Sequence, residues 1–218
     1  MKSTTMALLA AILFTGAASH ALTCPKPEGQ ELVGFWETRA TSKGGIGHTL
    51  EFRPDGTFVE AATVMVSSLY HVSGDRLFIA EVTGDRAEDG LKFRIEGGTL
   101  LQTMLNGSTV KKERVGKSEE GSPAIVGVWR YRHDTGAIAF ERYTEDGRML
   151  FRLPLAGSSG CYTVTGNRIS MTSSRGKTAI PFEVRAGELV LENPGKDPTA
   201  YGWVAEGPWY DREHLTPL

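Results

Sequence analysis

The sequence predicts an all-β protein made of two tandem small antiparallel up-and-down β-barrels, each of about eight strands. Three observations predict this fold. No window after residue 21 carries apolar residues at the period of an α-helix, whereas short runs of strand-forming residues recur. Gly accounts for 26 of the 218 residues, which indicates many turns. Finally, the two halves of the chain share motifs in the same order, as expected of a duplicated unit.

The first 21 residues have the organisation of a secretory signal peptide. Lys2 is followed by an apolar run from Met6 to Ala18, and Ser19-His20-Ala21 supplies small residues at the positions that signal cleavage requires. The apolar run is shorter than the roughly 20 residues that a membrane-spanning helix needs. We therefore expect a secreted or periplasmic protein.

Two cysteines follow the signal, Cys24 and Cys161. Because an exported chain folds in an oxidising compartment, an even number of cysteines permits a disulfide between them. The alternative for Cys24 is a lipid anchor, which the residues before it disfavour because Thr23 stands where a lipoprotein signal has a small residue.

The internal repeat defines the expected domains. Val33-Gly34-Phe35-Trp36 is matched by Val126-Gly127-Val128-Trp129, and Tyr70 to Gly74 is matched by Tyr162 to Gly166. Between the halves the sequence is polar and contains Gly and Pro, as in a linker. The expected boundaries are residues 32–115 for the first barrel, 116–124 for the linker, 125–206 for the second barrel and 207–218 for a tail packed on a barrel.

Turn residues divide the first repeat into short strands. Pairs such as Asp55-Gly56 and Asn106-Gly107 favour tight hairpins because both residues tolerate positive φ. Asp146-Gly147 continues the same rhythm in the second repeat. The strands expected in the first repeat are 32–40, 46–53, 57–66, 68–72, 76–83, 91–96, 99–105 and 108–114.

Strands joined in this way form a meander with two exposed edges, and closing the meander on itself removes both. The interior of an eight-stranded barrel is filled by side chains or holds one small ligand. We therefore expect each repeat to close on itself around its own core, with at most a small cavity.

Gly34-x-Trp36 and Gly127-x-Trp129 stand on the first strand of each meander. In this the chain resembles the lipocalin-like (calycin) barrels, whose first strand carries Gly-x-Trp near the closed end. The resemblance implies a structural role for Trp36 and Trp129. It also implies that an Arg of the last strand covers the Trp, and Arg114 is placed to do so in the first repeat. The second repeat departs from the pattern because its last segment, 199–204, contains no Arg.

Strand alternation selects the candidate ligand-binding residues. His48 and Glu60 share the parity of apolar neighbours, so they could point into the first barrel and contact a ligand or each other. Glu141 and Tyr143 occupy the corresponding inner row of the second repeat. The alternative for the charged candidates is a solvated position at a barrel rim or a register shift.

Tyr70 and Tyr162 occupy matched positions in the two repeats. They could contact a ligand, but the alternative is core packing with a tethered hydroxyl group.

Composition excludes several function classes. A net charge of −2 provides no basic surface for nucleic acid. The histidine and cysteine spacings match no metal motif, and no nucleotide-binding motif or catalytic constellation occurs, so we expect neither metal nor cofactor. No segment is expected to span a membrane.

The sequence therefore favours an exported, non-enzymatic binding protein for a small apolar or amphipathic ligand. One alternative is a cell-envelope interaction or structural module with filled barrels and a protein partner. Another is an enzyme with a barrel-mouth site around His48 and Glu60.

Overall fold

The structure, a computed structural model, describes residues 23–28, 31–80, 90–117 and 120–204. These residues form fourteen β-strands, all paired antiparallel, which confirms the predicted all-β class. The expected signal peptide and the tail at 207–218 lie outside the described residues. The first half of the chain contains β1 (Gly34–Thr38), β2 (Ile46–Phe52), β3 (Thr57–Ser73), β4 (Arg76–Ile79), β5 (Leu91–Glu96), β6 (Thr99–Thr103) and β7 (Thr109–Val115).

The second half repeats this order strand for strand. Asp55-Gly56 leads from β2 into β3 and Asp146-Gly147 leads from β9 into β10, and both glycines have the positive φ expected of tight turns. The strands are β8 (Gly127–Arg132), β9 (Ile138–Tyr143), β10 (Arg148–Thr165), β11 (Arg168–Ser173), β12 (Gly176–Arg185), β13 (Glu188–Leu191) and β14 (Thr199–Trp203).

The third strand of each half is unusually long, with 17 residues in β3 and 18 in β10. Two separate strands, 57–66 and 68–72, were expected where β3 runs without a break. The stretch contains no Gly, Pro, Asn or Asp, so no residue in it favours a turn. In β10 the strand passes Pro154 through a register shift between Pro154 and Ala156, which accommodates a residue without a backbone N–H.

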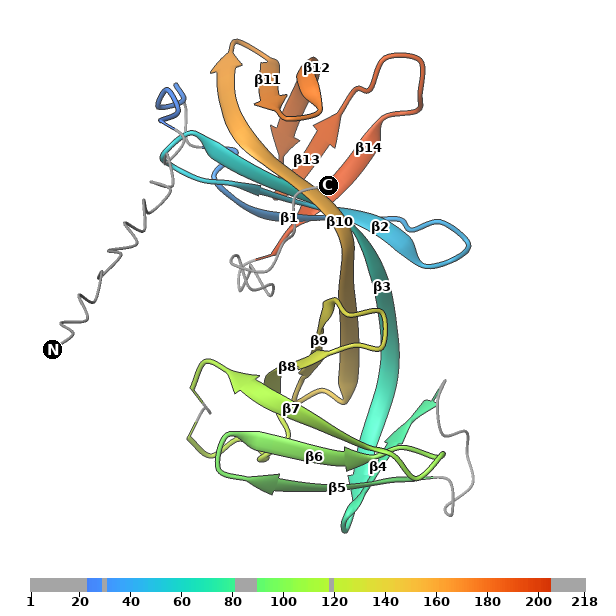
Figure 1. The fold of residues 1–218 in the computed structure, drawn as a ribbon. Helices are drawn as coiled ribbons and strands as arrows, with labels where there is room; N and C mark the ends of the chain where they lie inside the picture. The colour runs from blue at the N-terminus through green and yellow to red at the C-terminus, as the bar shows by residue number, and fades with distance from the viewer. Residues whose placement is uncertain (1–22, 29–30, 81–89, 118–119, 205–218) are drawn as a thin grey trace, which may run out of the picture.

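The fourteen strands form one closed ring, in which β1 pairs with β14 and every other strand pairs with its neighbours in the sequence. The two long strands also pair with each other, from Thr57 opposite Cys161 to Leu69 opposite Arg148. This pairing crosses the ring and divides it into two circuits of strands. In Figure 1, β3 and β10 run side by side between the two groups.

We call these the terminal and the central circuit. The terminal circuit consists of β1, β2, the first part of β3, the last part of β10, and β11–β14. The central circuit consists of the last part of β3, β4–β9 and the first part of β10. Exchanging the two repeats converts one circuit into the other.

This pairing corrects the expectation that each repeat closes on itself. The last strand of the first repeat, β7, pairs with β8 of the second repeat, and β1 pairs with β14. Each circuit therefore takes strands from both repeats. The physical reason lies in the long strands, because β3 and β10 continue past the point where a hairpin would have returned the chain to its own half.

Each of the two circuits contains its own apolar cluster. The larger one packs Trp36, Phe52, Tyr162 and Leu189 in the terminal circuit. The other packs Trp129, Tyr143, Leu77, Leu91 and Leu100 in the central circuit. Because the clusters share no residue, each circuit has its own interior.

The two Gly-x-Trp motifs make equivalent hydrogen bonds. The indole N–H of Trp36 donates to the carbonyl of Leu32 at 2.8 Å, and that of Trp129 donates to Ile125 at 2.7 Å. Both indoles are buried. The equivalent bonds show that the two motifs perform the same structural task.

Arg114 covers a tryptophan, but not the one expected. Its guanidinium lies 4.1 Å from the ring centre of Trp129 and donates to the backbone carbonyls of Ala124 and Val126. The expectation that Arg114 covers Trp36 is therefore wrong. The cause is the exchange of strands, which places β7 beside β8.

Trp203 takes the place of the missing arginine in the other circuit. It stands opposite Trp36 as Arg114 stands opposite Trp129. Its indole lies so close to Gly34 that a Cβ atom there would be 2.6 Å from the indole nitrogen. The terminal circuit is thus covered by an aromatic ring where the central circuit uses a cation.

A disulfide joins Cys24 to Cys161 with a Cα–Cα distance of 5.3 Å, which confirms the pairing expected from the sequence. It fastens the segment before β1 to β10 across 137 residues of chain. The bond therefore links the first half of the molecule covalently to the second.

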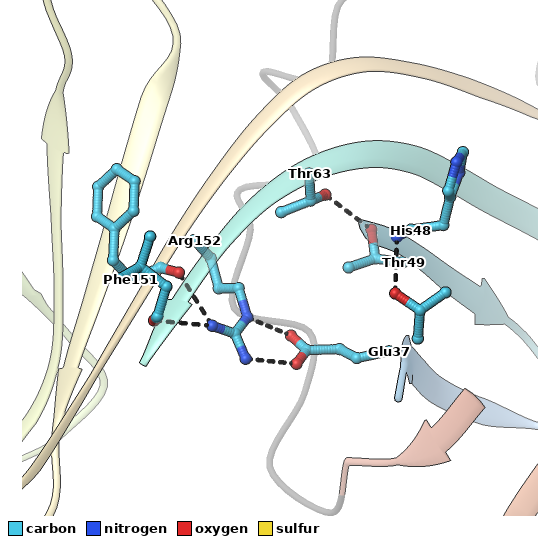
Figure 2. A network of polar contacts seen from close by, with 8 residues as sticks. Glu37, His48, Thr49, Thr63, Phe151 and Arg152 are labelled. Carbon is cyan, nitrogen blue, oxygen red and sulfur yellow. Dashed lines mark hydrogen bonds and ion pairs between the residues drawn. The ribbon is translucent and has the colours of Figure 1, made fainter. Parts of the chain in front are cut away.

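The two circuits also meet at an ion pair between β1 and β10. Arg152 donates two hydrogen bonds to Glu37, at 2.9 and 2.7 Å, and both side chains are 12% exposed. Figure 2 shows the fork of the guanidinium facing the carboxylate. Phe35, Val59 and Phe140 pack nearby as a third apolar cluster made of strands from both circuits.

Candidate functional site

The central circuit contains a partly open cavity of about 380 Å³. Its wall is mainly apolar and includes Ile79, Leu91, Met149 and Phe151. Protein sites for small molecules have volumes of about 300–1,000 Å³, with an apolar wall and a few placed polar groups. The cavity has the size and the wall of such a site, so its polar groups decide what it can bind.

A buried ion pair lies in this cavity. The Nζ atom of Lys112 donates to Oε2 of Glu141 at 2.5 Å, and the hydroxyl of Tyr143 donates to the same oxygen at 2.6 Å. Lys112 is 2% exposed, and Glu141 and Tyr143 are also buried. Charged residues are rarely buried this deeply, and their desolvation is costly even when they are paired.

Strand alternation on β7 and β9 explains how these groups reach the interior. Lys112 stands opposite Leu100 of β6, and Glu141 stands opposite Trp129 of β8. Leu100 and Trp129 both belong to the buried cluster of the central circuit. Residues directly opposite on paired strands face the same side of a sheet, so Lys112 and Glu141 face inward.

Gln102 adds a buried amide to the cavity wall. It is 1% exposed, and its side-chain oxygen has no hydrogen-bond partner within the described residues. An unsatisfied polar atom in a protein interior costs about 1–3 kcal/mol. Such groups are uncommon in native structures and require an explanation.

Burial sets the protonation of the polar cluster. It raises the pKa of Tyr143 well above its usual value, and the Glu141 carboxylate raises it further. The same two causes raise the pKa of Tyr131, which also lines the cavity. Burial lowers the pKa of Lys112, and the attraction of Glu141 opposes that change. Both phenols thus stay protonated at neutral pH.

The terminal circuit shows that the fold does not require these polar groups. Leu50 stands opposite Trp36 as Glu141 stands opposite Trp129. By the same comparison of registers, Tyr201 corresponds to Lys112. The remaining equivalents follow from the strands, with Leu191 corresponding to Gln102 and Phe52 to Tyr143.

The two expected candidates of the first repeat do not come together. His48 is exposed and stands opposite Ala62, and in Figure 2 its imidazole points away from Glu37 and Arg152. Glu60 stands opposite Leu50 in the terminal circuit and accepts a hydrogen bond from the hydroxyl of Ser158 at 2.6 Å. The structure therefore provides no joint site for His48 and Glu60.

Tyr70 and Tyr162 have equivalent tethers. Tyr70 donates its hydroxyl to the carbonyl of Thr144 at 2.7 Å, and Tyr162 donates to that of Arg53 at 2.9 Å. Each acceptor precedes an Asp-Gly turn of the other repeat. The hydroxyl groups thus hold turns in place, and neither residue lines the cavity.

Of the candidates predicted from the sequence, Glu141 lines the cavity, and Tyr143 donates a hydrogen bond to Glu141. The sequence analysis missed Lys112, Gln102 and Tyr131, which also line the cavity. Residues 109–115 are polar on both faces, so alternation could not mark Lys112 as inward. One usable signal was the comparison of the repeats, which sets Lys112 against Tyr201 and Gln102 against Leu191.

The fold and the cavity together define an all-β protein with a polar cluster buried in one of two strand circuits. No protein-family model, curated protein or solved structure matched the chain. The lipocalin-like resemblance therefore rests on the Gly-x-Trp motifs.

Within the described part of the chain, no three His, Cys, Asp or Glu side chains gather as a possible metal site. The same residues contain no helix with the length and apolar character needed to cross a membrane. The disulfide is compatible with an oxidising extracellular compartment.

Proposed function

We propose that the protein is an exported, non-enzymatic carrier that binds a small amphipathic molecule in the cavity of the central circuit. In this proposal each circuit acts as a lipocalin-like barrel. The terminal circuit is filled and structural, and the central circuit holds the ligand. The disulfide supports an oxidising compartment as the place of action.

The observation that carries the proposal is the difference between the two interiors. The central cavity of about 380 Å³ contains the Lys112–Glu141 pair and the unpartnered oxygen of Gln102. At the equivalent places the terminal circuit has Tyr201, Leu50 and Leu191, all buried in its apolar cluster. Because apolar residues satisfy the fold at these positions, the polar ones are best explained by a ligand.

Filling the cavity tests the proposal. Val110 lines the cavity from β7, whereas Val115 lies on the same strand with its side chain 39% exposed. We expect Val110→Phe to abolish the binding of single-chain amphiphiles such as decanamide, measured by isothermal titration calorimetry on the disulfide-intact chain. Val115→Phe is the matched control and should bind like the original protein.

Native mass spectrometry of the protein purified from its own source provides an independent readout. A bound small molecule that is lost in Val110→Phe and kept in Val115→Phe would support the carrier function. Equal binding by both variants would place any ligand elsewhere on the molecule. A protein that binds no amphiphile and carries no small molecule would favour the envelope interaction module instead.

A further inference from the structure

We propose that the cavity selects a ligand whose head group is uncharged and carries both a hydrogen-bond donor and an acceptor, as a primary amide or a hydroxyl group does. This inference rests on the proposed carrier function and specifies the chemical class of its ligand. It follows from the charge balance of the cavity, from the unsatisfied polar atoms and from their spacing.

The charge balance disfavours an ionic head group. Lys112 and Glu141 are joined at 2.5 Å, and the other two charged residues of the cavity wall, Arg132 and Asp134, are also opposite in sign, so the formal charges of the wall cancel. A carboxylate beside Lys112 would place two anions around one buried cation, and an ammonium beside Glu141 would do the reverse. Either ion would remain uncompensated in an interior where unpaired charge is very costly.

The polar groups of the cavity wall have hydrogen-bonding positions that a ligand with both a donor and an acceptor would satisfy. The unpartnered oxygen of Gln102 can only accept, so it needs a ligand N–H or O–H. The ammonium of Lys112 has three N–H groups, and Glu141 is its one hydrogen-bond acceptor within the described residues. The ring of Tyr131 lies 4.8 Å from the ammonium nitrogen as a second partner, which leaves one N–H group for a ligand oxygen.

One small head group can reach both residues. Gln102 stands opposite Val110, and Lys112 lies two positions further along β7 on the same face. Diagonal neighbours of this kind are about 7–8 Å apart in the backbone, within reach of long side chains. A single amide or hydroxyl group between them can donate to Gln102 and accept from Lys112.

The apolar part of the cavity wall and the cavity volume limit the rest of the ligand. Ile79, Leu91, Met149 and Phe151 contribute apolar surface to the cavity wall, which a hydrocarbon chain can contact. At about 30 Å³ for each water-sized group, the cavity of about 380 Å³ accepts on the order of a dozen non-hydrogen atoms. The ligand class is thus a small aliphatic amide or alcohol with one apolar chain.

Three probes of equal size test the head group at neutral pH by titration calorimetry: decanamide, methyl nonanoate and decanoate. The amide can donate and accept, the ester can only accept, and the carboxylate is charged. We expect decanamide to bind roughly tenfold more tightly than the ester, the value of about one good hydrogen bond. We expect decanoate to bind most weakly of the three.

Substitutions copied from the terminal circuit identify the residue responsible. Gln102→Leu, which introduces the residue found at position 191, should reduce the affinity for decanamide roughly tenfold and leave that for methyl nonanoate unchanged. Tyr201→Phe, in the terminal circuit, is the control and should alter neither affinity. Near-ultraviolet circular dichroism of each variant confirms that the fold is retained.

The outcomes separate the two proposals. Tightest binding of decanoate, or equal binding of amide and ester, would overturn the assignment of the head group and leave the carrier function intact. A Gln102→Leu variant that folds and still prefers the amide would also overturn it. If none of the three probes binds the original protein, both the head-group assignment and the carrier function fail.

Discussion

The central circuit keeps a pair of charges in its interior, where well-packed apolar residues of similar size are often at least as stabilising. The terminal circuit fills the same positions with Leu50, Phe52 and Tyr201. Removing one member of a buried pair leaves the other uncompensated, whereas replacing the whole cluster by apolar residues removes the desolvation cost. The stability of substituted proteins can therefore distinguish a site kept for function from a structural pair.

We expect Lys112→Met and Glu141→Leu each to lower the free energy of unfolding by about 3–5 kcal/mol. The triple variant Lys112→Met/Glu141→Leu/Tyr143→Phe should instead be equal to the original protein or up to about 4 kcal/mol more stable. Urea denaturation followed by tryptophan fluorescence measures all three. A triple variant less stable than both single variants would show that the polar cluster supports the fold.

Tyrosine ionisation provides a second test at the scale of single residues. Burial, followed by nearby carboxylates, raises the pKa of Tyr162 and Tyr201 from 10.0 to about 12. The folded state therefore holds these protons more tightly than the unfolded state. This contribution to stability is complete below pH 10 and is lost as the pH rises towards 12.

We accordingly expect the free energy of unfolding to decrease over that pH range, and to decrease less in Tyr162→Phe and Tyr201→Phe. Denaturation curves at a series of pH values measure the decrease, and tyrosinate absorbance follows the ionisation. Ionisation of all the tyrosines near pH 10 in the folded protein would contradict the expectation.

Among the elements, the first strand of each repeat requires a glycine at one position. Gly34 and Gly127 both have a φ in the region that favours glycine, at +146° and +125°. At each position a side chain of the opposite strand, Trp203 or Arg114, lies against the backbone. The glycine of Gly-x-Trp is thus required both by the backbone and by the group that covers it.

We expect Gly34→Ala and Gly127→Ala each to cost more than about 1 kcal/mol of stability, because the new Cβ atom meets both strain and a neighbouring side chain. Gly98→Ala is a suitable control, since nothing lies within 4 Å of the added atom and its φ is not positive. It should change stability by less than about 0.5 kcal/mol. Chemical denaturation of the three variants checks the difference, and equal effects would contradict it.

Many of the turns and strand boundaries could be predicted from the sequence. Asp55-Gly56 and Asp146-Gly147 mark their turns because few other residues accept that geometry. The continuity of β3 was missed because a strand break was assumed where no turn residue stands. The pairing of β7 with β8 could not be predicted, because Arg114 fits over either Trp36 or Trp129 with the same alternation. For the same reason the cavity could not be assigned to its strands.

On the scale of the whole molecule, the two repeats are interlocked. Both circuits need β3 and β10, and the pairings of β1 with β14 and of β7 with β8 connect the repeats again. Glu37 and Arg152 add an ion pair between them. The two repeats therefore cannot separate unless the strand pairings of both circuits are broken.

A cut between the repeats tests this interlocking. We expect a protein with a protease site inserted at the exposed Gly121 to stay in one piece after cleavage, even with the Cys24–Cys161 disulfide reduced. Size-exclusion chromatography should elute both fragments together in buffer and separately in denaturant. Fragments that separate under native, reducing conditions would show that each repeat closes alone.

The exchange of strands also bears on how such a chain could arise. One repeat by itself has seven strands, and along much of its long third strand one edge is paired only by the other repeat, so two identical copies could supply each other with the missing pairing. The ancestor of this protein would then have been a symmetric homodimer, and gene fusion would have made its two subunits a single polypeptide. After such a fusion, the interior of one circuit could acquire charged residues while the interior of the other stayed apolar.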